Sequence, residues 1–131
     1  MTAPTKTDIR QLGYRMSANT DDAVVERCAS VVLEAYILKY VTQAEVTAAS
    51  LTDEIGEAWS ALTFLRFIQD TEFGTRTGGE KKRFEYGDPA EVLGAVKREC
   101  ALKLRQLNDA HPATGKVEDI CEVYFKTQLF N

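Results

Sequence analysis

The chain has 131 residues, of which 44% are hydrophobic and 27% are charged, and its formal net charge is -4 at pH 7. This length suits one domain that buries its own core, and the composition is too apolar for a wholly disordered protein. The negative charge excludes a general attraction to nucleic acid or to an anionic membrane, so any such contact has to be local.

The first residues are polar, and we expect residues 1–7 to form a flexible end. Thr7 then stands where it can cap a short helix that carries Ile9 and Leu12 and ends at Gly13. The start lacks the apolar centre of a secretory signal, and no apolar run reaches the about 18 residues of a membrane span. The sequence therefore predicts a cytosolic protein, or one assembled in a cytosol.

A long amphipathic helix is predicted next. Asn19 or Thr20 is expected to cap it, and Asp21 and Asp22 suit the positive end of the helix dipole. Its apolar residues recur every three or four positions, as one buried stripe requires: Val24, Val25, Cys28, Val31, Val32, Ala35, Tyr36 and Tyr40.

Two further helices are predicted before residue 70. Thr42-Gln-Ala-Glu45 matches a capping box, which predicts a short helix over 43–49. A longer helix is expected to start at Ser50 or Thr52. It is apolar nearly all round, as is typical of the buried centre of a bundle or of one side of a subunit interface, and its aromatic residues are assigned to the core. Its main stripe is Leu51, Ile55, Ala58, Trp59, Leu62, Leu65 and Ile68, with Phe64 and Phe67 on a second face.

Residues 73–86 differ from the rest of the chain. Gly78-Gly79 separates two short runs that contain β-branched and aromatic residues, which indicates a β-hairpin or extended loop because glycine adopts the positive φ of tight hairpin turns. Asp88-Pro89-Ala-Glu91 then marks the start of another helix, whose stripe is Val92, Val96, Cys100, Leu104 and Leu107. A last helix is predicted over about 116–128. The predicted fold is all-α: a single domain over 1–131, an antiparallel bundle of about four main helices with residues 73–86 projecting from it.

The residues that commonly carry chemistry are sparse. Cys28, Cys100 and Cys121 lie on predicted apolar stripes without a CxxC pair, so we expect buried free thiols, and the single histidine, His111, stands in a polar loop. No nucleophile has an evident base beside it. Carboxylate pairs occur at helical spacing but are expected on solvated faces: Asp53 with Glu57, Glu118 with Glu122 and Asp119 with Glu122. We predict no enzyme activity, no metal and no cofactor.

The glycines of residues 74–81 do not form a phosphate-binding Walker loop. Glu80 separates Gly79 from Lys81, and Lys82 stands where the loop needs Ser or Thr. The net charge of residues 73–86 is +2 on an acidic protein, from Arg76, Lys81, Lys82 and Arg83 against Glu80 and Glu85. One interpretation is an edge hairpin that its charges keep from aggregating. The other is an arm that contacts an acidic neighbour or a nucleic-acid backbone.

The order of these elements resembles the head-tail connector, or adaptor, proteins of tailed bacteriophages. The residues that carry the resemblance are Thr7 to Tyr14, then Thr20 to Glu26 leading to Tyr40, then the hydrophobic helix around Ala58 to Leu65, followed by the glycine-containing segment Phe73 to Tyr86. The segment from Val41 to Ser50 and the closing helix from 116 onward are longer than in the smallest members.

The resemblance implies a structural virion protein that forms a ring with copies of itself, joins the portal to the tail-completion proteins, and surrounds DNA that passes without sequence-specific contact. It implies assembly in the host cytoplasm and no membrane. Residues 73–86 would be the contact arm, through Arg76, Gly78, Gly79, Lys81, Lys82, Arg83, Phe84 and Tyr86. The alternative is a cytosolic helical binding or regulatory module that uses the same basic segment on nucleic acid or on a protein partner.

Overall fold

A computed structural model describes residues 1–70 and 89–111 of the chain. Over these residues the fold is all-α, as predicted, and contains no strand. The predicted hairpin at 73–86 and the predicted helix at 116–128 lie outside the described residues. The elements in chain order are α1 (Lys6–Gln11), α2 (Asp22–Ala35), the 3-10 helix η1 (Ile37–Lys39), α3 (Gln43–Ala48), α4 (Glu54–Ile68) and α5 (Pro89–Ala110).

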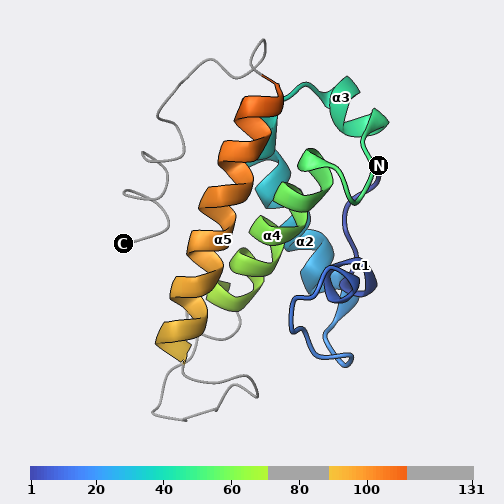
Figure 1. Cartoon of the computed structure of the whole chain (residues 1–131). Coiled ribbons are helices and arrows are strands. Elements are labelled where there is room, and N and C mark those ends of the chain that lie inside the picture. Colours follow the sequence, from blue (N-terminus) through green and yellow to red (C-terminus); the bar gives the residue numbers. More distant parts are fainter. Residues whose placement is uncertain (71–88, 112–131) are drawn as a thin grey trace.

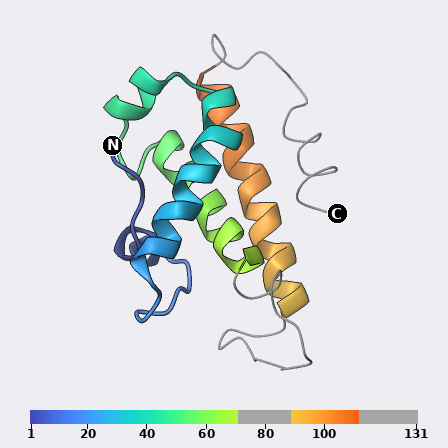
Figure 2. The same cartoon turned by 180° about the vertical axis from the view of Figure 1, so that it is seen from behind.

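The three long helices lie side by side and alternate in direction, with α4 between α2 and α5 (Figures 1 and 2). At one end of this bundle α4 stops at Ile68, α5 starts at Pro89, and the connection from α1 to α2 passes (Figure 1). We call it the Ile68 end. At the opposite end α3 lies near the last turn of α5.

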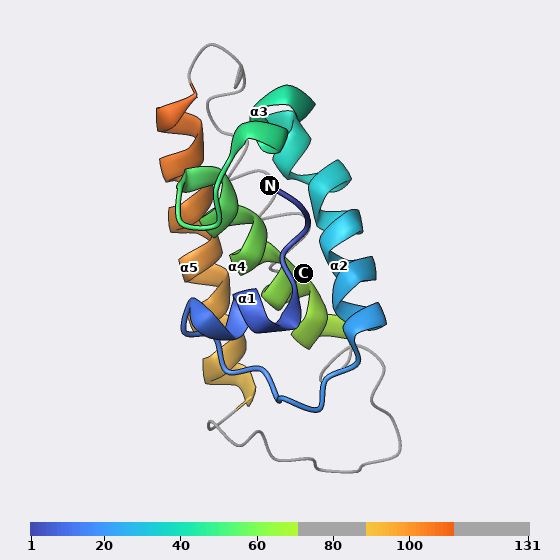
Figure 3. The ribbon, with the colours of Figure 1, turned by 90° about the vertical axis from the view of Figure 1, so that its right-hand side faces the viewer.

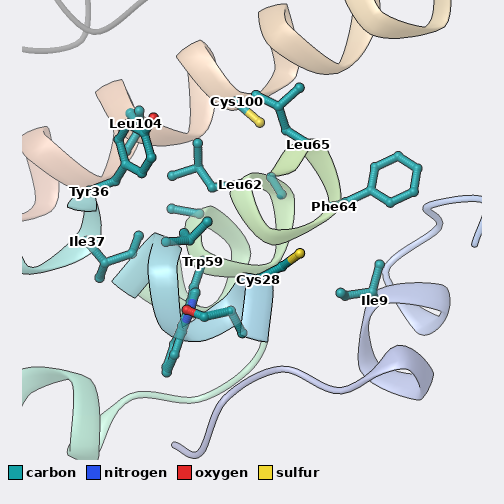
Figure 4. Packing of buried hydrophobic residues seen from close by; sticks show 14 of the residues in the cluster. Ile9, Cys28, Tyr36, Ile37, Trp59, Leu62, Phe64, Leu65, Cys100 and Leu104 are labelled. Carbon is teal, nitrogen blue, oxygen red and sulfur yellow. The ribbon is translucent and has the colours of Figure 1, made fainter. Parts of the chain in front are cut away.

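Helix α4 is the centre of the fold. Twelve of its fifteen residues are buried, among them Trp59, Leu62 and Phe64, so the prediction of a central helix that is apolar nearly all round is confirmed. Figure 4 shows how its side chains divide among its neighbours. Leu62 and Leu65 point toward Cys100 and Leu104 of α5, Trp59 lies against α2, and Phe64 points to the side of α4 on which Ile9 of α1 lies.

The first residues pack against this body. The Met1 amino group donates hydrogen bonds of 2.7 Å to the carbonyls of Val46 and Thr47 in α3, and Met1 and Ala3 contact the core cluster. The segment then descends to α1, which crosses α4 (Figure 3). The structure therefore places contacts where the sequence suggested a flexible end.

The N-cap predicted for α1 is wrong by two residues. Thr5, not Thr7, caps the helix, because Asp8 reaches back to the Thr5 N–H at 3.0 Å while the Thr5 hydroxyl accepts from the Asp8 N–H at 3.2 Å. This reciprocal pair is a capping box. The helix ends before Gly13 as predicted, and Gly13 has the positive φ of 100° that glycine adopts without steric cost.

Helix α2 also differs at both ends from the prediction. Asp21 is its cap, through a 3.0 Å bond from the Ala23 N–H to Oδ1, rather than Asn19 or Thr20. The helix ends at Ala35 and not at Tyr40, because the backbone leaves helical geometry at Tyr36 and continues as η1. Most of the predicted stripe is buried, but Val31 is 37% exposed and Ala29 is buried instead.

The capping box at Thr42 and Glu45 is confirmed. The Thr42 N–H donates to Glu45 Oε1 at 2.8 Å, the Glu45 N–H donates to the Thr42 hydroxyl at 3.2 Å, and α3 follows. Helix α4 begins later than predicted, with Asp53 as its cap instead of Ser50 or Thr52. Asp53 accepts from the Gly56 N–H and, through its other oxygen, from the Ser50 N–H, at 2.9 Å each.

Helix α5 begins at Pro89 and buries most of its predicted stripe. Val96, Cys100, Leu104 and Leu107 are buried and Val92 is partly buried against the core. Proline at the first helical position needs no hydrogen-bond partner for its nitrogen.

Candidate functional site

The residues predicted to form the contact arm are not placed by the structure. Arg76, Gly78, Gly79, Lys81, Lys82, Arg83, Phe84 and Tyr86 all fall within 71–88, outside the described residues. What the structure does place are the two helix ends from which that segment departs and to which it returns. Both are at the Ile68 end of the bundle, beside the connection from α1 to α2 (Figure 1).

The end of α4 and the start of α5 lie at the same end of the bundle, so the length of the connection between them can be compared with the distance that it has to span. Helices α4 and α5 are antiparallel neighbours, and such pairs are commonly joined by about two to eight residues. Here the connection runs over residues 69–88. The chain therefore has many more residues between these two helix ends than the distance between the helices demands.

Tyr14 ties the Ile68 end together. Its ring packs against that of Phe64 of α4 in a tilted arrangement, with centroids 5.1 Å apart and planes at 34°, and its hydroxyl donates a long hydrogen bond of 3.4 Å to Glu99 of α5. Burial, followed by the nearby charge of Glu99, raises the pKa of the Tyr14 phenol. The phenol is therefore neutral at physiological pH and acts here as a hydrogen-bond donor that holds the connection between α1 and α2 against two helices.

The two described cysteines are buried free thiols, as predicted, and Cys121 lies outside the described residues. Burial raises the pKa of both thiols, with smaller contributions from Asp70 at Cys28 and from Glu99 at Cys100. Because the thiolate is the nucleophilic form, neither side chain is activated for covalent chemistry.

Lys97 is a buried side chain that sequence reasoning missed. It is 9% exposed, and it is the one buried charged residue in the part of the chain that the structure describes. Burial lowers its pKa. The signal was available, since Leu93, Lys97, Cys100 and Leu104 are spaced by four, three and four residues and so share one face of α5.

The carboxylates at helical spacing have structural partners rather than a shared site. Asp53 caps α4, while Glu57 accepts a 3.0 Å salt bridge from Lys103, which joins α4 to α5. Glu118, Asp119 and Glu122 lie outside the described residues. Within residues 1–70 and 89–111, no group of three or more His, Cys, Asp or Glu side chains is arranged to hold a metal ion.

His111 makes a contact that the sequence did not suggest. Its Nδ1 lies 3.1 Å from Glu45 Oε2, so the end of α5 is joined to α3 at the end of the bundle opposite Ile68. The pKa of Glu45 is held below its usual value, first by the hydrogen bond from the Thr42 backbone and then by contacts that include His111. This carboxylate therefore serves a helix cap and a link between two helices.

Comparison with known proteins adds no family: the chain matches no protein-family model, no curated protein and no solved structure. In the described part of the chain, no helix has both the length and the apolar character needed to cross a membrane.

Proposed function

We propose that this protein is a structural subunit of a phage-type head-tail junction, which forms a ring with copies of itself between a portal and the tail-completion proteins. In this role it has no chemistry of its own, and DNA passes through the ring without sequence-specific contact. Its place is the virion, and its assembly takes place in the cytoplasm of the bacterial host. Residues 73–86 are its contact arm.

The observation that carries the proposal is the long connection between adjacent antiparallel helices. Helix α4 packs directly against α5 as well as against α2. A connection as long as residues 69–88 is therefore not needed to span the distance from the end of α4 to the start of α5. The arm within this connection has a net charge of +2, whereas the whole chain has -4. An acidic body and a basic arm are complementary in charge between neighbouring copies.

The test of the arm compares two variants with the same change in charge. Lys81→Ser/Lys82→Ser/Arg83→Ser removes three cations from the arm, and Arg27→Ser/Arg98→Ser/Arg105→Ser removes three exposed cations from α2 and α5. We expect sedimentation over a concentration series to show self-association in the wild type and the control, and its loss in the arm variant, with unchanged helical circular dichroism in all three.

A different outcome favours the regulatory alternative. If the wild type stays monomeric and binds nucleic acid with an affinity that falls steeply as salt rises, and the arm variant loses that binding, the segment works on nucleic acid instead. The genomic neighbourhood gives an independent test. We expect genes for a portal, a capsid protein and tail proteins beside the gene for this chain, and their absence would overturn the proposal.

A further inference from the structure

The connection from α1 to α2 borders an open hollow of about 650 Å³ at the Ile68 end. Its lining includes two arginines and no carboxylate. The polar lining side chains are Thr7, Arg10, Gln11, Tyr14, Arg15 and Ser17, and Gly13, Met16 and Ala18 complete the lining. The two arginines come from different segments, since Arg10 is in α1 and Arg15 follows the turn at Gly13. The positive φ of Gly13 allows the chain to turn there so that both arginines border the same space.

The rim of the hollow is held in place by contacts with the core. The Tyr14 ring packs against Phe64, its hydroxyl donates a hydrogen bond to Glu99, and Met16 is buried. On the far side, Lys6 donates hydrogen bonds to the carbonyls of Ala18 and Thr20 at 2.8 and 3.0 Å, which fastens the loop to α1. A rim that is already ordered loses little conformational entropy when a ligand binds.

The two arginines that border the hollow form no ion pair within the described part of the chain. Lys6 pairs with Asp22, Arg66 with Asp70 and Lys103 with Glu57, whereas neither Arg10 nor Arg15 forms an ion pair there. Both arginines are exposed, and Ser17 Oγ accepts from the Asn19 N–H at 3.1 Å, so its own proton remains available to donate. Two guanidinium groups and hydroxyl donors around one space are the groups that proteins use for phosphate.

We infer that the hollow bounded by Arg10 and Arg15 binds a phosphate group, either as a free or small-molecule phosphate or as a phosphodiester of nucleic acid. The two guanidinium groups supply paired N–H donors to the phosphate oxygens, and Ser17 and Thr7 supply hydroxyl donors. The inference does not depend on the proposed function, because the site is on the body of the protein and needs no other subunit.

The experiment titrates the full chain with two probes. Inorganic pyrophosphate is followed by amide chemical shifts in NMR, and a fluorescent single-stranded oligonucleotide of mixed sequence is followed by anisotropy at low and at physiological salt. The variant Arg10→Gln/Arg15→Gln removes both cations of the hollow. The control Arg98→Gln/Arg105→Gln makes the same change of charge on the exposed face of α5.

We expect pyrophosphate to shift the amides of residues 13–18, and the hollow variant to bind at least tenfold more weakly than the wild type, with the control within about twofold, as a loss of two charge-assisted contacts implies. Binding of the oligonucleotide alone, with the same dependence on Arg10 and Arg15, identifies the phosphodiester as the ligand. Equal weakening in the hollow variant and the control, or no binding of either probe, overturns the inference. Unchanged circular dichroism in both variants excludes misfolding as the cause.

Discussion

Gly56 stands where the loop before α4 passes closest to the helix. A Cβ at this position would collide with the backbone carbonyls of Ser50 and Leu51. These are main-chain atoms held by Asp53, which accepts from the Ser50 N–H and the Gly56 N–H. The glycine is therefore required by a close approach of two backbone segments and not by an unusual φ.

We predict that Gly56→Ala destabilises the protein by about 1–3 kcal/mol, the usual cost of overpacking a site that cannot relax. Gly94→Ala is the matched control, since a Cβ there meets only the end of the Arg98 side chain, at 3.6 Å. Alanine in a helix interior is better than glycine by about 0.5–1 kcal/mol, so this control should be more stable than the wild type. Urea denaturation of both variants gives the comparison, and two changes of the same sign would contradict it.

Ser60 places a polar hydroxyl group in the apolar core. It is fully buried in α4, and its Oγ has no hydrogen-bond partner among the described residues. A buried hydroxyl without a partner costs about 1–3 kcal/mol of desolvation. Its near neighbour Thr63 avoids this cost, because its hydroxyl donates to the Trp59 carbonyl at 2.7 Å.

We expect Ser60→Ala to stabilise the protein by about 1 kcal/mol, from relief of desolvation and from better helix propensity. Ser30→Ala, on the exposed face of α2, reports the propensity contribution alone. Thermal unfolding of the two variants separates the contributions. A gain at Ser60 no larger than that at Ser30 would show that the buried hydroxyl carries no penalty.

At the scale of elements, the sequence predicted which helices exist better than where they begin. Spacing of apolar residues identified α2, α4 and α5, and the Thr42–Glu45 box identified α3. The starts of α1, α2 and α4 were misplaced because several neighbouring residues can cap a helix. At α1 the choice of Thr5 is decided by Asp8, which completes a reciprocal pair with it.

The misassignment of Val31 has a cause in tertiary packing. Trp59 Nε1 donates to the carbonyl of Ala29 at 2.9 Å, so the indole approaches α2 at its small residue. Helix α2 therefore presents Ala29 to α4, and Val31 is left 37% exposed. The spacing of apolar residues predicts a broad apolar stripe on a helix, but it does not show against which small residue of that helix a large side chain such as Trp59 will pack.

Contacts between residues far apart in the chain, such as Tyr14 with Glu99 and Glu57 with Lys103, also cannot be predicted from one sequence.

The Glu45 carboxylate makes the link between α3 and α5 dependent on pH. Its pKa is lower in the folded protein than in the unfolded chain, where a glutamate titrates near about 4.3, because the Thr42 N–H and His111 favour the charged form. The folded state therefore gains stability from this group above that pH, and loses it as the pH falls through the folded-state pKa.

We predict that Glu45→Gln lowers the melting temperature at pH 7, and that the difference from the wild type shrinks as the pH falls through the lowered folded-state pKa of Glu45, because the wild-type carboxylate then becomes neutral too. Melting curves between pH 7 and pH 3 measure this difference. Glu34→Gln, an exposed glutamate on α2, serves as the control and should show little difference at any pH. A Glu45→Gln effect of constant size across this range would contradict the account.

At the scale of the whole molecule, the two proposed contact regions lie at one end. The hollow at Arg10 and Arg15 and the departure points of residues 69–88 share the Ile68 end, while the opposite end has the internal link between Glu45 and His111. The sequence indicated a basic segment and its place between two helices. It did not indicate the hollow, because the two arginines border the same space only through the turn at Gly13 and the anchoring of Tyr14.

Because α4 lies between α2 and α5, the order in which these helices are synthesised on the ribosome determines when each side of α4 can be covered. When α4 has been made, α2 is already available to cover one of its sides, but α5 is not. Leu62 and Leu65 then have no counterpart until Cys100 and Leu104 have been synthesised (Figure 4). A nascent chain at this stage exposes this apolar face of α4 to water and to other chains. The long connection before α5 extends the time for which that surface stays uncovered.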